Sequence, residues 1–472
     1  MRPMTWQMGL ILGFGAMLGA CGSSSSGAGG TGGAAGNGSG GTTVTDAGAD
    51  VATGTGGATP TGTGGNNNTD GAVTDTGAPP ANAAVYIMSN AAAGNAVYGF
   101  HRGADGALTP MAAPFPTGGK GSGMGLGEQG ALAYDRTNKR LLTVNAGEHS
   151  FSVLPVAADG TLGTALNVAA STAGTVGAML NGPKSITFHG DLVYVLYEGT
   201  ATIPSMIAGW KLAAAADGTL GATAIAGSAL PLSSATQSVD PAQIEFSPDG
   251  KFLVVTEKQS GAGGAVMGAG KIDTFAVDAA GVATKKGSYD PAPLAGANAD
   301  GGVATQMTPF GFEFLGTYLI VSEAGSTGVG AYTYADGVIA PVSASQFMST
   351  DPAPCWVAVT SNWAYVTNAR GPSISGFTVG AGGALSPVGP IANGVVASTG
   401  RTIAGDGGVT FQGPTDEFFS ADGKFLYVLN AAVPSIGIFK VESNGTLSRV
   451  GTGDYTPATA AMPTGAAGIV AL

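Results

Sequence analysis

The chain repeats one strand-and-turn pattern about seven times between residues 85 and 450. Each copy has a strand-like run, an Asp-Gly or Asn-Gly turn, a second strand and then a small polar residue, most clearly in 243–255 (QIEFSPDGKFLVV) and 417–428 (EFFSADGKFLYV). A repeat of about 50 residues built from short strands and tight turns is typical of a β-propeller, in which each copy is one four-stranded blade. The sequence therefore predicts an all-β fold, a seven-bladed β-propeller of antiparallel blades, over residues 83–472.

Asp-Gly and Asn-Gly pairs mark the hairpin turns of the repeat. In the last copy, Asp422-Gly423 separates the first two strands and Asn444-Gly445 separates the last two. Because both central residues of a type I′ turn need positive φ, such pairs predict type I′ hairpins. The pairs that correspond to Asn444-Gly445 in other copies are Asp105-Gly106, Asp159-Gly160, Asp217-Gly218 and Asp336-Gly337.

The first copy lacks its innermost strand. It begins directly with strands at 85–90 and 96–101, whereas the other copies have an inner strand, starting near residues 129, 184, 242, 310, 355 and 415. The C-terminal segment 463–472 (PTGAAGIVAL) resembles a lone inner strand. We therefore expect this C-terminal strand to complete the first blade and close the ring, which removes the exposed edges of an open sheet.

Residues 1–20 have the pattern of a bacterial export signal. Arg2 supplies a positive charge, 8–17 (MGLILGFGAM) form an apolar stretch of signal-peptide length, and 18–21 (LGAC) resemble a lipobox. In such sequences the sulfur of the cysteine carries a diacylglycerol, and more than one acyl chain makes anchoring stable. An ordinary secretory signal with a chance cysteine is the alternative. The pattern predicts a lipoprotein of the bacterial cell envelope, attached to a membrane through lipidated Cys21.

Residues 21–82 are predicted to be a tether between the lipid and the propeller. After Cys21 they consist mainly of Gly, Ser, Thr, Ala and Asn and contain no Lys or Arg. Such a segment buries too little apolar surface to offset its ordering entropy, so we expect it to be disordered. Its r.m.s. reach as a flexible coil would be roughly 40–45 Å. Gly22, next to the anchor, is consistent with delivery to the outer membrane, facing the periplasm or the surface.

Composition excludes some classes of partner. The net charge of −12 argues against nucleic-acid binding, which needs clustered Lys and Arg. If Cys21 is acylated, Cys355 has no partner for a disulfide within the chain, and we expect it to be a buried small side chain. No cofactor or metal ion is expected, and the protein is expected to be a monomer.

Polar residues recur where the strands of a propeller meet one mouth of the central channel. Inner strands begin and second strands end on the same face, so we expect these residues to surround a site for a small molecule or a protein partner. The alternative is that each one caps its own turn. The second-strand ends are Asn90, Asn145, Glu198, Glu257, Glu323, Asn368 and Asn430, and the inner-strand starts add Glu128, Gln129, Lys184, Gln243 and Asp416.

One of the three histidines is predicted to lie at this mouth. His149 follows a second strand, whereas His101 and His189 belong to the opposite face. His149 is therefore a candidate general base, with a solvated loop histidine as the alternative. The glycine-rich segment 119–130 (GKGSGMGLGEQG) has spacing similar to a dinucleotide motif, but a strand follows where a nucleotide fold needs a helix. We expect this segment to arch over the mouth as a loop.

The run 247–258 (SPDGKFLVVTEK), the Asn-Ala strand ends and the Phe-x-Val strands followed by Gly turns are similar to the lactonase family of seven-bladed propellers. That family includes bacterial phosphogluconolactonase and the carboxymuconate lactonizing enzymes, and the resemblance covers about residues 84–472. It implies a mouth with His and Arg and a Glu from another blade. The family's His-bearing inner-strand start corresponds to Glu128-Gln129-Gly130 here, and its Pro-Arg-His corresponds to Pro183-Lys184-Ser185. Gln243 stands where the family has a Glu, and Glu257-Lys258 stands where it has Asn-Arg. Glu198 matches an acidic residue of the family.

Two functions follow from these residues. In the first, the propeller is a binding module that holds a small molecule or a partner at its mouth. In the second, it is a hydrolase that opens a lactone, of the 6-phosphogluconolactone or muconolactone type, outside the cytoplasm. His149 or Glu257 would then activate water, and Lys184 or Lys258 would stabilise the developing oxyanion.

Overall fold

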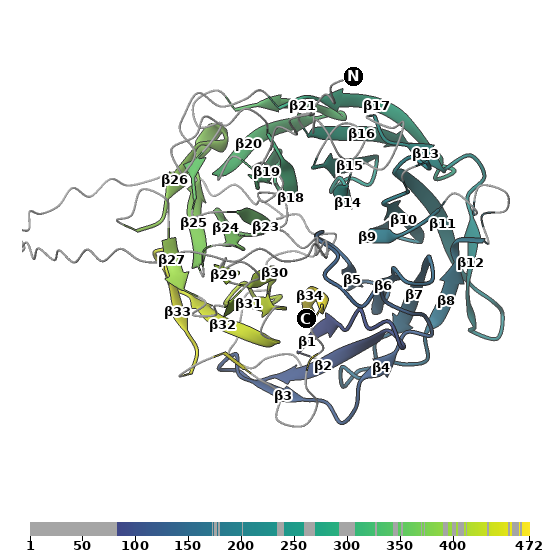
Figure 1. The fold of residues 1–472 in the computed structure, drawn as a ribbon, viewed down its shortest axis with the longest axis horizontal. Coiled ribbons are helices and arrows are strands. Elements are labelled where there is room, and N and C mark those ends of the chain that lie inside the picture. Colours follow the sequence, from purple (N-terminus) through teal and green to yellow (C-terminus); the bar gives the residue numbers. More distant parts are fainter. Residues whose placement is uncertain are drawn as a thin grey trace, which may run out of the picture.

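The described residues form seven sheets around one axis (Figure 1). The computed structural model describes residues 83–171, 173, 177, 180–200, 202–233, 240–258, 270–291, 307–325, 328–342, 348–350, 353–369, 371, 373–389, 395–398, 403–404, 410–411, 413–431, 434–451, 454–455, 462 and 465–472. The predicted signal peptide, Cys21 and the predicted tether lie outside these ranges. In the part of the chain that is described, no helix is long and apolar enough to cross a membrane.

Each blade is an antiparallel sheet of four main strands, numbered from the axis outward. Blade 1 contains β34 (Ala467–Ala471), β1 (Ala84–Met88), β2 (Ala96–Arg102) and β3 (Leu108–Pro110), with β4 (Phe115–Pro116) also on β2. Blade 2 contains β5 (Leu132–Asp135), β6 (Arg140–Asn145), β7 (Ser150–Pro155) and β8 (Leu166–Ala169). Blade 3 contains β9 (Pro183–His189), β10 (Leu192–Tyr197), β11 (Met206–Ala214) and β12 (Leu220–Ala224), with β13 (Leu230–Pro231) on β11.

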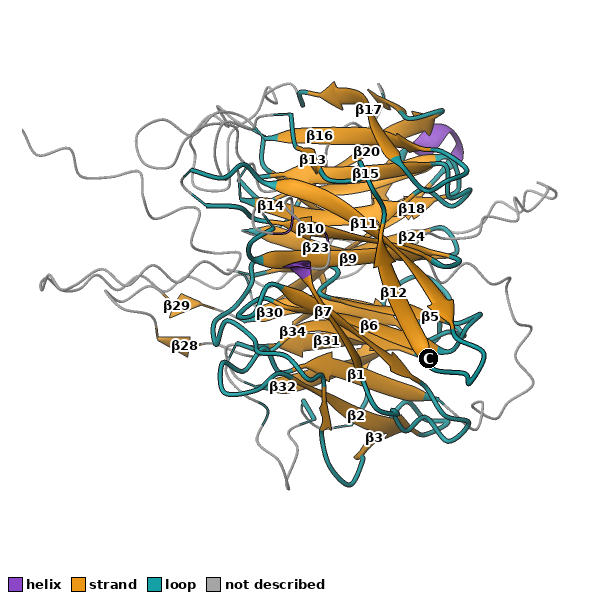
Figure 2. Ribbon diagram, turned by 90° about the vertical axis from the view of Figure 1, so that its right-hand side faces the viewer, coloured by secondary structure: helices purple, strands orange, loops and turns teal. Residues whose placement is uncertain are grey.

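The remaining blades repeat this order. Blade 4 contains β14 (Pro241–Phe246), β15 (Phe252–Glu257), β16 (Lys271–Val277) and β17 (Ala283–Tyr289). Blade 5 contains β18 (Pro309–Leu315), β19 (Tyr318–Glu323), β20 (Gly328–Ala335), β21 (Val338–Pro341) and β22 (Met348–Ser349). Blade 6 contains β23 (Pro354–Thr360), β24 (Trp363–Asn368), β25 (Ser373–Val379), β26 (Leu385–Pro387) and β27 (Val395–Ser398), with the 3₁₀ turn η3 (Ala381–Gly383) before β26. Blade 7 contains β30 (Pro414–Phe419), β31 (Phe425–Asn430), β32 (Ser435–Val441) and β33 (Leu447–Arg449). A hairpin of β28 (Ile403–Ala404) and β29 (Thr410–Phe411) stands apart from the blades (Figure 2).

The C-terminal strand closes the ring, as the sequence predicts. β34 pairs antiparallel with β1, placing Val85 opposite Ala471 and Ile87 opposite Ile469. Ile87 and Ile469 belong to one buried apolar cluster that also contains Phe425 and Leu429 of blade 7. The last strand therefore joins the first and last blades through both backbone pairing and side-chain packing.

The hairpin turns differ in part from the prediction. At Asp336-Gly337 both residues have positive φ, 49° and 76°, as a type I′ turn requires. At Asp159-Gly160 only the glycine does, at 84°, and the amide of Gly160 donates to the carbonyl of Ala157 at 3.0 Å. This is a type I turn followed by a bulge at the glycine. The type I′ prediction is therefore wrong for this hairpin, and wrong in the same way at Asp105, Asp217 and Asn444.

The reason lies in the side chain that precedes each glycine. The carboxylate of Asp159 accepts the backbone N–H of Thr161 at 3.0 Å and its hydroxyl at 2.7 Å. This local bond holds the Asp backbone at negative φ and competes with the type I′ geometry. Asp105, Asp217 and Asn444 accept the N–H two residues on in the same way.

A repeated tyrosine links neighbouring blades. It is the third residue of the second strand, and its buried hydroxyl donates to the carbonyl of the turn glycine in the next blade. The pairs are Tyr86 with Gly160, Tyr194 with Gly281 at 2.6 Å, Tyr365 with Gly445 at 2.7 Å and Tyr427 with Gly106 at 2.9 Å. The last pair crosses from blade 7 to blade 1, so the link also spans the closure of the ring.

We expect Tyr365→Phe to lower the free energy of unfolding by about 1 kcal/mol, because one buried hydrogen bond is lost while the ring remains. Denaturant unfolding followed by fluorescence would measure the change. Tyr98→Phe, at a half-buried position on β2, is the matched control and should change stability much less. Equal losses at both positions would show that the inter-blade bond contributes nothing.

Candidate functional site

Four charged side chains meet at the edge of the ring where inner strands begin and second strands end, here called the mouth. The ammonium of Lys184 lies 3.1 Å from a carboxylate oxygen of Glu198, and that of Lys258 lies 2.9 Å from Asp240. Lys184 is also 3.9 Å from Asp240, which joins the two pairs into one network across blades 3 and 4. The prediction that Lys184, Glu198 and Lys258 share one face is confirmed.

Asp240 is the member of the network that sequence reasoning missed. It precedes Pro241, and prolines likewise begin β9, β18, β23 and β30. Proline has no N–H to donate, so it suits the first residue of a strand. Asp240 has φ of 48°, in the left-handed region that Asp tolerates better than most residues. An Asp before a repeated inner-strand proline is the signal that could have identified it.

A glycine-rich loop of residues 117–131, here called the mouth loop, covers the network, as the sequence predicts. The ammonium groups of Lys184 and Lys258 donate to the carbonyls of Leu126 at 2.7 Å and Gly127 at 2.6 Å. The indole N–H of Trp356, from blade 6, donates to the carbonyl of Glu128 at 2.6 Å. These bonds hold the mouth loop against three blades.

Glycine is needed where the mouth loop packs on the blades. A Cβ at Gly121 would lie 2.1 Å from the backbone carbon of Asn90, which no side chain could accommodate. The side chain of Asn90 in turn accepts the N–H of Ser122 at 2.9 Å and donates to its hydroxyl at 2.9 Å. Asn90 was predicted to bind a ligand, and in this structure it fastens the mouth loop.

Burial and charge set the protonation of the network. Burial raises the pKa of Glu128 to about 8, although Lys184 and Lys258 act in the opposite direction. Burial also works against ionisation of Asp240, but the adjacent Lys258 and Lys184 outweigh it and lower the Asp240 pKa. Burial lowers the pKa of Lys258. Glu128 is therefore largely protonated near neutral pH, and it lies beside two ion pairs, Lys184 with Glu198 and Lys258 with Asp240.

His149 is exposed at the rim of this network. Its Nδ1 accepts the backbone N–H of Gly182 at 3.1 Å. The opposite side of Gly182 faces Glu198, whose Oε2 would lie 3.5 Å from a Cβ at that glycine. A neutral imidazole that accepts at Nδ1 carries its proton on Nε2, so it has no free lone pair for a substrate. Glu198, with 39 % of its side chain exposed, is the more available acceptor.

Gln129 and Gln243, predicted to bind a ligand at the mouth, lie inside the channel. The amide of Gln129 exchanges two hydrogen bonds with the backbone of Val357, at 2.8 and 2.9 Å, and so links the start of blade 2 to blade 6. Gln243 makes the same kind of pair with Phe312 of blade 5, at 2.9 and 2.7 Å. Both side chains act as cross-links between blades.

The other predicted second-strand ends are buried and bond to neighbouring strands and loops. Asn145 donates to Ser150 and Ser152, and Asn368 donates to Ser373 and Ser375, at 2.7–3.1 Å. Asn430 donates to Ser435 at 3.3 Å and to Asp454 at 3.1 Å. The buried Glu257 accepts the N–H of Ser233 at 3.1 Å, and Glu323 accepts the hydroxyl of Tyr332 at 3.1 Å. Of the second-strand ends predicted to bind a ligand, Glu198 is the one that retains partial exposure beside the network.

Cys355 is fully buried in β23 and is disulfide-bonded. The only other cysteine in the sequence is Cys21, which lies outside the described residues. The sequence analysis excludes a disulfide at Cys355 only if Cys21 is acylated, and that condition stays a prediction. One sulfur atom cannot both carry a thioether-linked lipid and form a disulfide, so lipidation at Cys21 and this bond exclude each other.

Within the ranges described above, no three His, Cys, Asp or Glu side chains are grouped so that they could hold a metal ion. The charged network at the mouth is instead an arrangement of ion pairs. The ligands that suit it are groups that accept from ammonium or donate to carboxylate.

Comparison with known proteins supports the class that this architecture defines, a lactonase-like seven-bladed propeller. Residues 131–291, about a third of the chain, match the family described as "Lactonase, 7-bladed beta-propeller". No curated protein sequence matches the chain.

Solved structures share the fold at low sequence identity. A "putative 6-phosphogluconolactonase" of Bacteroides fragilis is 16% identical with a TM-score of 0.56, over 85% of this chain and 99% of that one. The periplasmic gluconolactonase PpgL of Pseudomonas aeruginosa is 16% identical with a TM-score of 0.55, over 82% and 98%. A protein from Lactobacillus plantarum is 14% identical with a TM-score of 0.54, over 83% and 99%. At these identities the likeness shows the fold.

Proposed function

We propose that this lactonase-like propeller binds a small, uncharged, polyhydroxylated ligand, such as a sugar lactone, at its mouth. The observation that carries the proposal is the network of Lys184, Glu198, Asp240 and Lys258, drawn from two blades at one edge of the ring. Carboxylates accept hydrogen bonds from sugar hydroxyls, and ammonium groups donate to a carbonyl or ring oxygen. The gluconolactonase among the structures of the same fold supports a ligand of this class.

The charge balance favours an uncharged ligand over a phosphorylated one. Phosphate recognition generally relies on Arg or on unpaired Lys. Here both ammonium groups already face carboxylates at about 3 Å, and both donate to carbonyls of the mouth loop. Asp240 and Glu198 are the partly exposed members, with 28 % and 39 % of their side chains accessible. A phosphate would therefore meet carboxylates first.

Isothermal titration calorimetry with glucono-1,5-lactone, gluconate and 6-phosphogluconate tests this proposal. We expect the lactone to bind and the phosphorylated acid to bind at least tenfold more weakly. Asp240→Asn should weaken lactone binding at least tenfold, since a carboxylate acceptor is lost, about 1.4 kcal/mol. Asp217→Asn, in an exposed turn of blade 3, is the control of equal charge change. Binding that Asp240→Asn leaves unchanged would refute a ligand at the network.

Lactone hydrolysis is the second candidate function. It is favoured by the position of Glu198, which pairs with Lys184 and also lies next to Gly182, whose N–H binds His149. Glu198 would accept the proton of the attacking water, and Lys184 would donate to the carbonyl oxygen as it becomes negative. Ring opening followed in a pH-stat should then exceed the spontaneous rate, and Glu198→Gln should lower kcat by about 10²–10⁴. Turnover that survives Glu198→Gln would rule out this role, and turnover lost in His149→Ala would transfer it to the histidine.

We infer from the N-terminal pattern that the protein is exported and held in the cell envelope by lipid on Cys21, as a monomer. Mass spectrometry of the membrane-extracted protein would distinguish an acylated N-terminal Cys21 from a Cys21–Cys355 disulfide. Acylation of Cys21 is the expected result, and the anchored protein would then lack the disulfide at Cys355. A soluble, disulfide-linked protein would refute the anchor without affecting the proposal for the mouth.

A further inference from the structure

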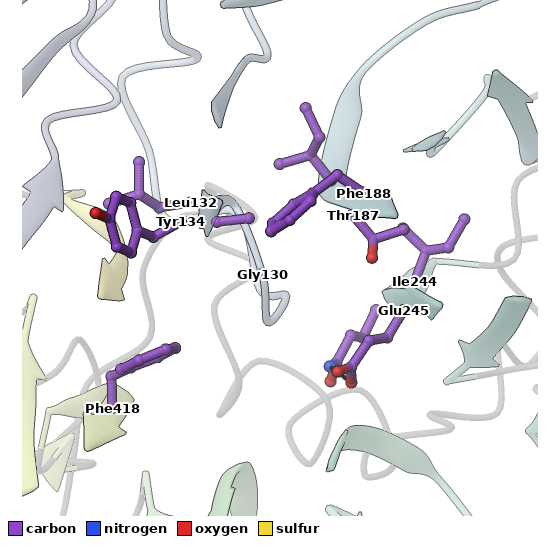
Figure 3. A pocket seen from close by; sticks show the side chains of 11 residues that line it. Gly130, Leu132, Tyr134, Thr187, Phe188, Ile244, Glu245 and Phe418 are labelled. Carbon is purple, nitrogen blue, oxygen red and sulfur yellow. Dashed lines mark hydrogen bonds between the residues drawn. The ribbon is translucent and has the colours of Figure 1, made fainter. Parts of the chain in front are cut away.

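A second hollow lies along the inner strands beyond their first residues, and Gln243 forms part of its wall. It has a volume of about 50 Å³ and is lined by inner strands of blades 2, 3, 4 and 7 (Figure 3). Glu245 lies at its polar end, and Tyr134, Phe188, Ile186 and Phe418 form apolar walls. A single water molecule needs at least about 10–15 Å³ on this measure, so the cavity holds about three to five water-sized groups. The proposed function makes no use of this cavity.

Glu245 presents an unsatisfied polar atom to this cavity. Its side chain is buried, with 4 % of the residue exposed, and its Oε1 has no hydrogen-bond partner among the described residues. Its Oε2 receives only a long bond from Gln243, at 3.4 Å. A buried polar atom without a partner is destabilising, so such atoms are uncommon outside functional sites.

Further acids surround Glu245 on the axis. Glu313 on β18 faces it electrostatically, and Asp416 and Glu417 on β30 in turn face Glu313. β9 contributes Thr187 to the lining, and β15 pairs Val254 with Glu245. A cation at this point would offset the cost of ionising a buried carboxyl group.

We propose that this cavity binds a small primary ammonium ion of about three or four non-hydrogen atoms, paired with Glu245. The ammonium would donate to the carboxylate of Glu245, including the unsatisfied Oε1. Its short apolar part would lie against Phe418 and Phe188, whose ring faces attract cations as well as apolar groups. The volume of the cavity sets the limit on size.

Binding requires a proton to leave the site. Burial raises the pKa of Glu245 well above its usual value, which favours the neutral carboxyl group in the free protein. The arriving ammonium ion keeps its own protons, and the O–H proton of Glu245 goes to solvent as the ion pair forms. Affinity should therefore increase by up to tenfold per pH unit while Glu245 remains protonated in the free protein.

The inference is independent of the proposed function. The cavity shares no lining residue with the network of Lys184, Glu198, Asp240 and Lys258. The two sites therefore use different side chains, and loss of lactone binding has no bearing on the ammonium site.

Isothermal titration calorimetry with ethylammonium chloride at pH 6, 7 and 8 tests the proposal, with sodium and calcium chloride titrated in parallel. We expect ethylammonium affinity to rise with pH and about one proton to be released near pH 7, measured with buffers of different ionisation enthalpy. Glu245→Gln keeps the shape of the side chain and should weaken binding at least tenfold and abolish its pH dependence. Phe418→Leu should weaken binding several-fold and keep the pH dependence.

Asp249→Asn is the matched control, because it removes one negative charge from an exposed turn of the same blade. It should leave ethylammonium binding unchanged. The proposal is overturned if ethylammonium does not bind at any of these pH values, or if Glu245→Gln binds it equally well. It is also overturned if sodium or calcium binds as tightly through Glu245, because the site would then be one for a metal ion.

Discussion

A chain that ends before Gly465 should fail to form a stable propeller. The deletion removes β34, which supplies the inner strand of blade 1 and leaves β1 with an unpaired edge at the axis. Ile469, Val470 and Leu472 are all at least 98 % buried, and burial of each such side chain contributes about 1.5–3 kcal/mol. Their sum is a large fraction of the roughly 5–15 kcal/mol that stabilises a typical domain. We expect loss of cooperative unfolding, or a Tm lowered by more than 15 °C on the scale of such losses.

Calorimetry and near-ultraviolet circular dichroism of the truncated protein would measure this effect. Ile469→Ala should retain the fold and cost about 2–5 kcal/mol, since it creates a cavity at the closure. Val338→Ser, at an outer strand position that is 60 % exposed, is the control and should leave the Tm nearly unchanged. Unaltered melting of the truncated chain would show that the ring is stable without its closing strand.

The second large effect is a loss of stability as pH rises from about 5 to about 8. Burial raises the pKa of Glu323 to about 8. Burial, reinforced by neighbouring acids, also raises the pKa values of Glu313, Asp416 and Glu417. In the unfolded chain such groups ionise near pH 4, so between the two values the unfolded state binds fewer protons than the folded state. Stability is therefore full below the unfolded pKa and falls with rising pH, by up to about 1.4 kcal/mol per group and pH unit.

Denaturant unfolding across this pH range would measure the slope, and Glu313→Gln should reduce it. The amide keeps the oxygen that accepts from Gln129 at 3.0 Å but cannot ionise, so the variant should gain stability at pH 8 and change little at pH 5. The exposed Asp217→Asn is the control for a single charge. Asp240 acts in the opposite direction, because its lowered pKa adds stability that is lost on acidification. If stability instead rises from pH 5 to pH 8, ionisation of the channel acids is not the main cause of the pH dependence.

The blades, their order and the closing strand could be predicted because local patterns specify them. Alternating strands and Asp-Gly turns fix each hairpin, and the missing inner strand of the first copy has one counterpart at the C-terminus. The turn type could not be predicted, since the Asp159 side chain bonds to the next turn residue and overrides the preference of the pair. The glycine alone then takes the left-handed conformation.

The location of the candidate site could be predicted from the sequence, but only some of its residues could. Strand order places Lys184, Glu198 and Lys258 on one edge, and the structure joins them with Asp240. Whether a polar side chain at a strand end faces the mouth or its own blade depends on which hydrogen-bonding side chains the neighbouring strand offers it. Asn145 turns toward Ser150 and Ser152 of the adjacent strand, a pairing that is visible in the sequence as Asn followed by Ser five and seven residues later. Gln129 could not have been placed, because its partner Val357 is 228 residues away.

The pairing of β34 with β1 also imposes an order on folding. Blades 2 to 7 are each built from consecutive strands, so each can form once its own segment has left the ribosome or a translocon. Blade 1 has to wait for β34, and the closing contact spans almost the whole domain in sequence, which makes it entropically slow. A nascent chain of this protein thus stays an open arc until β34 has been synthesised, and the ring then closes by the docking of one short strand.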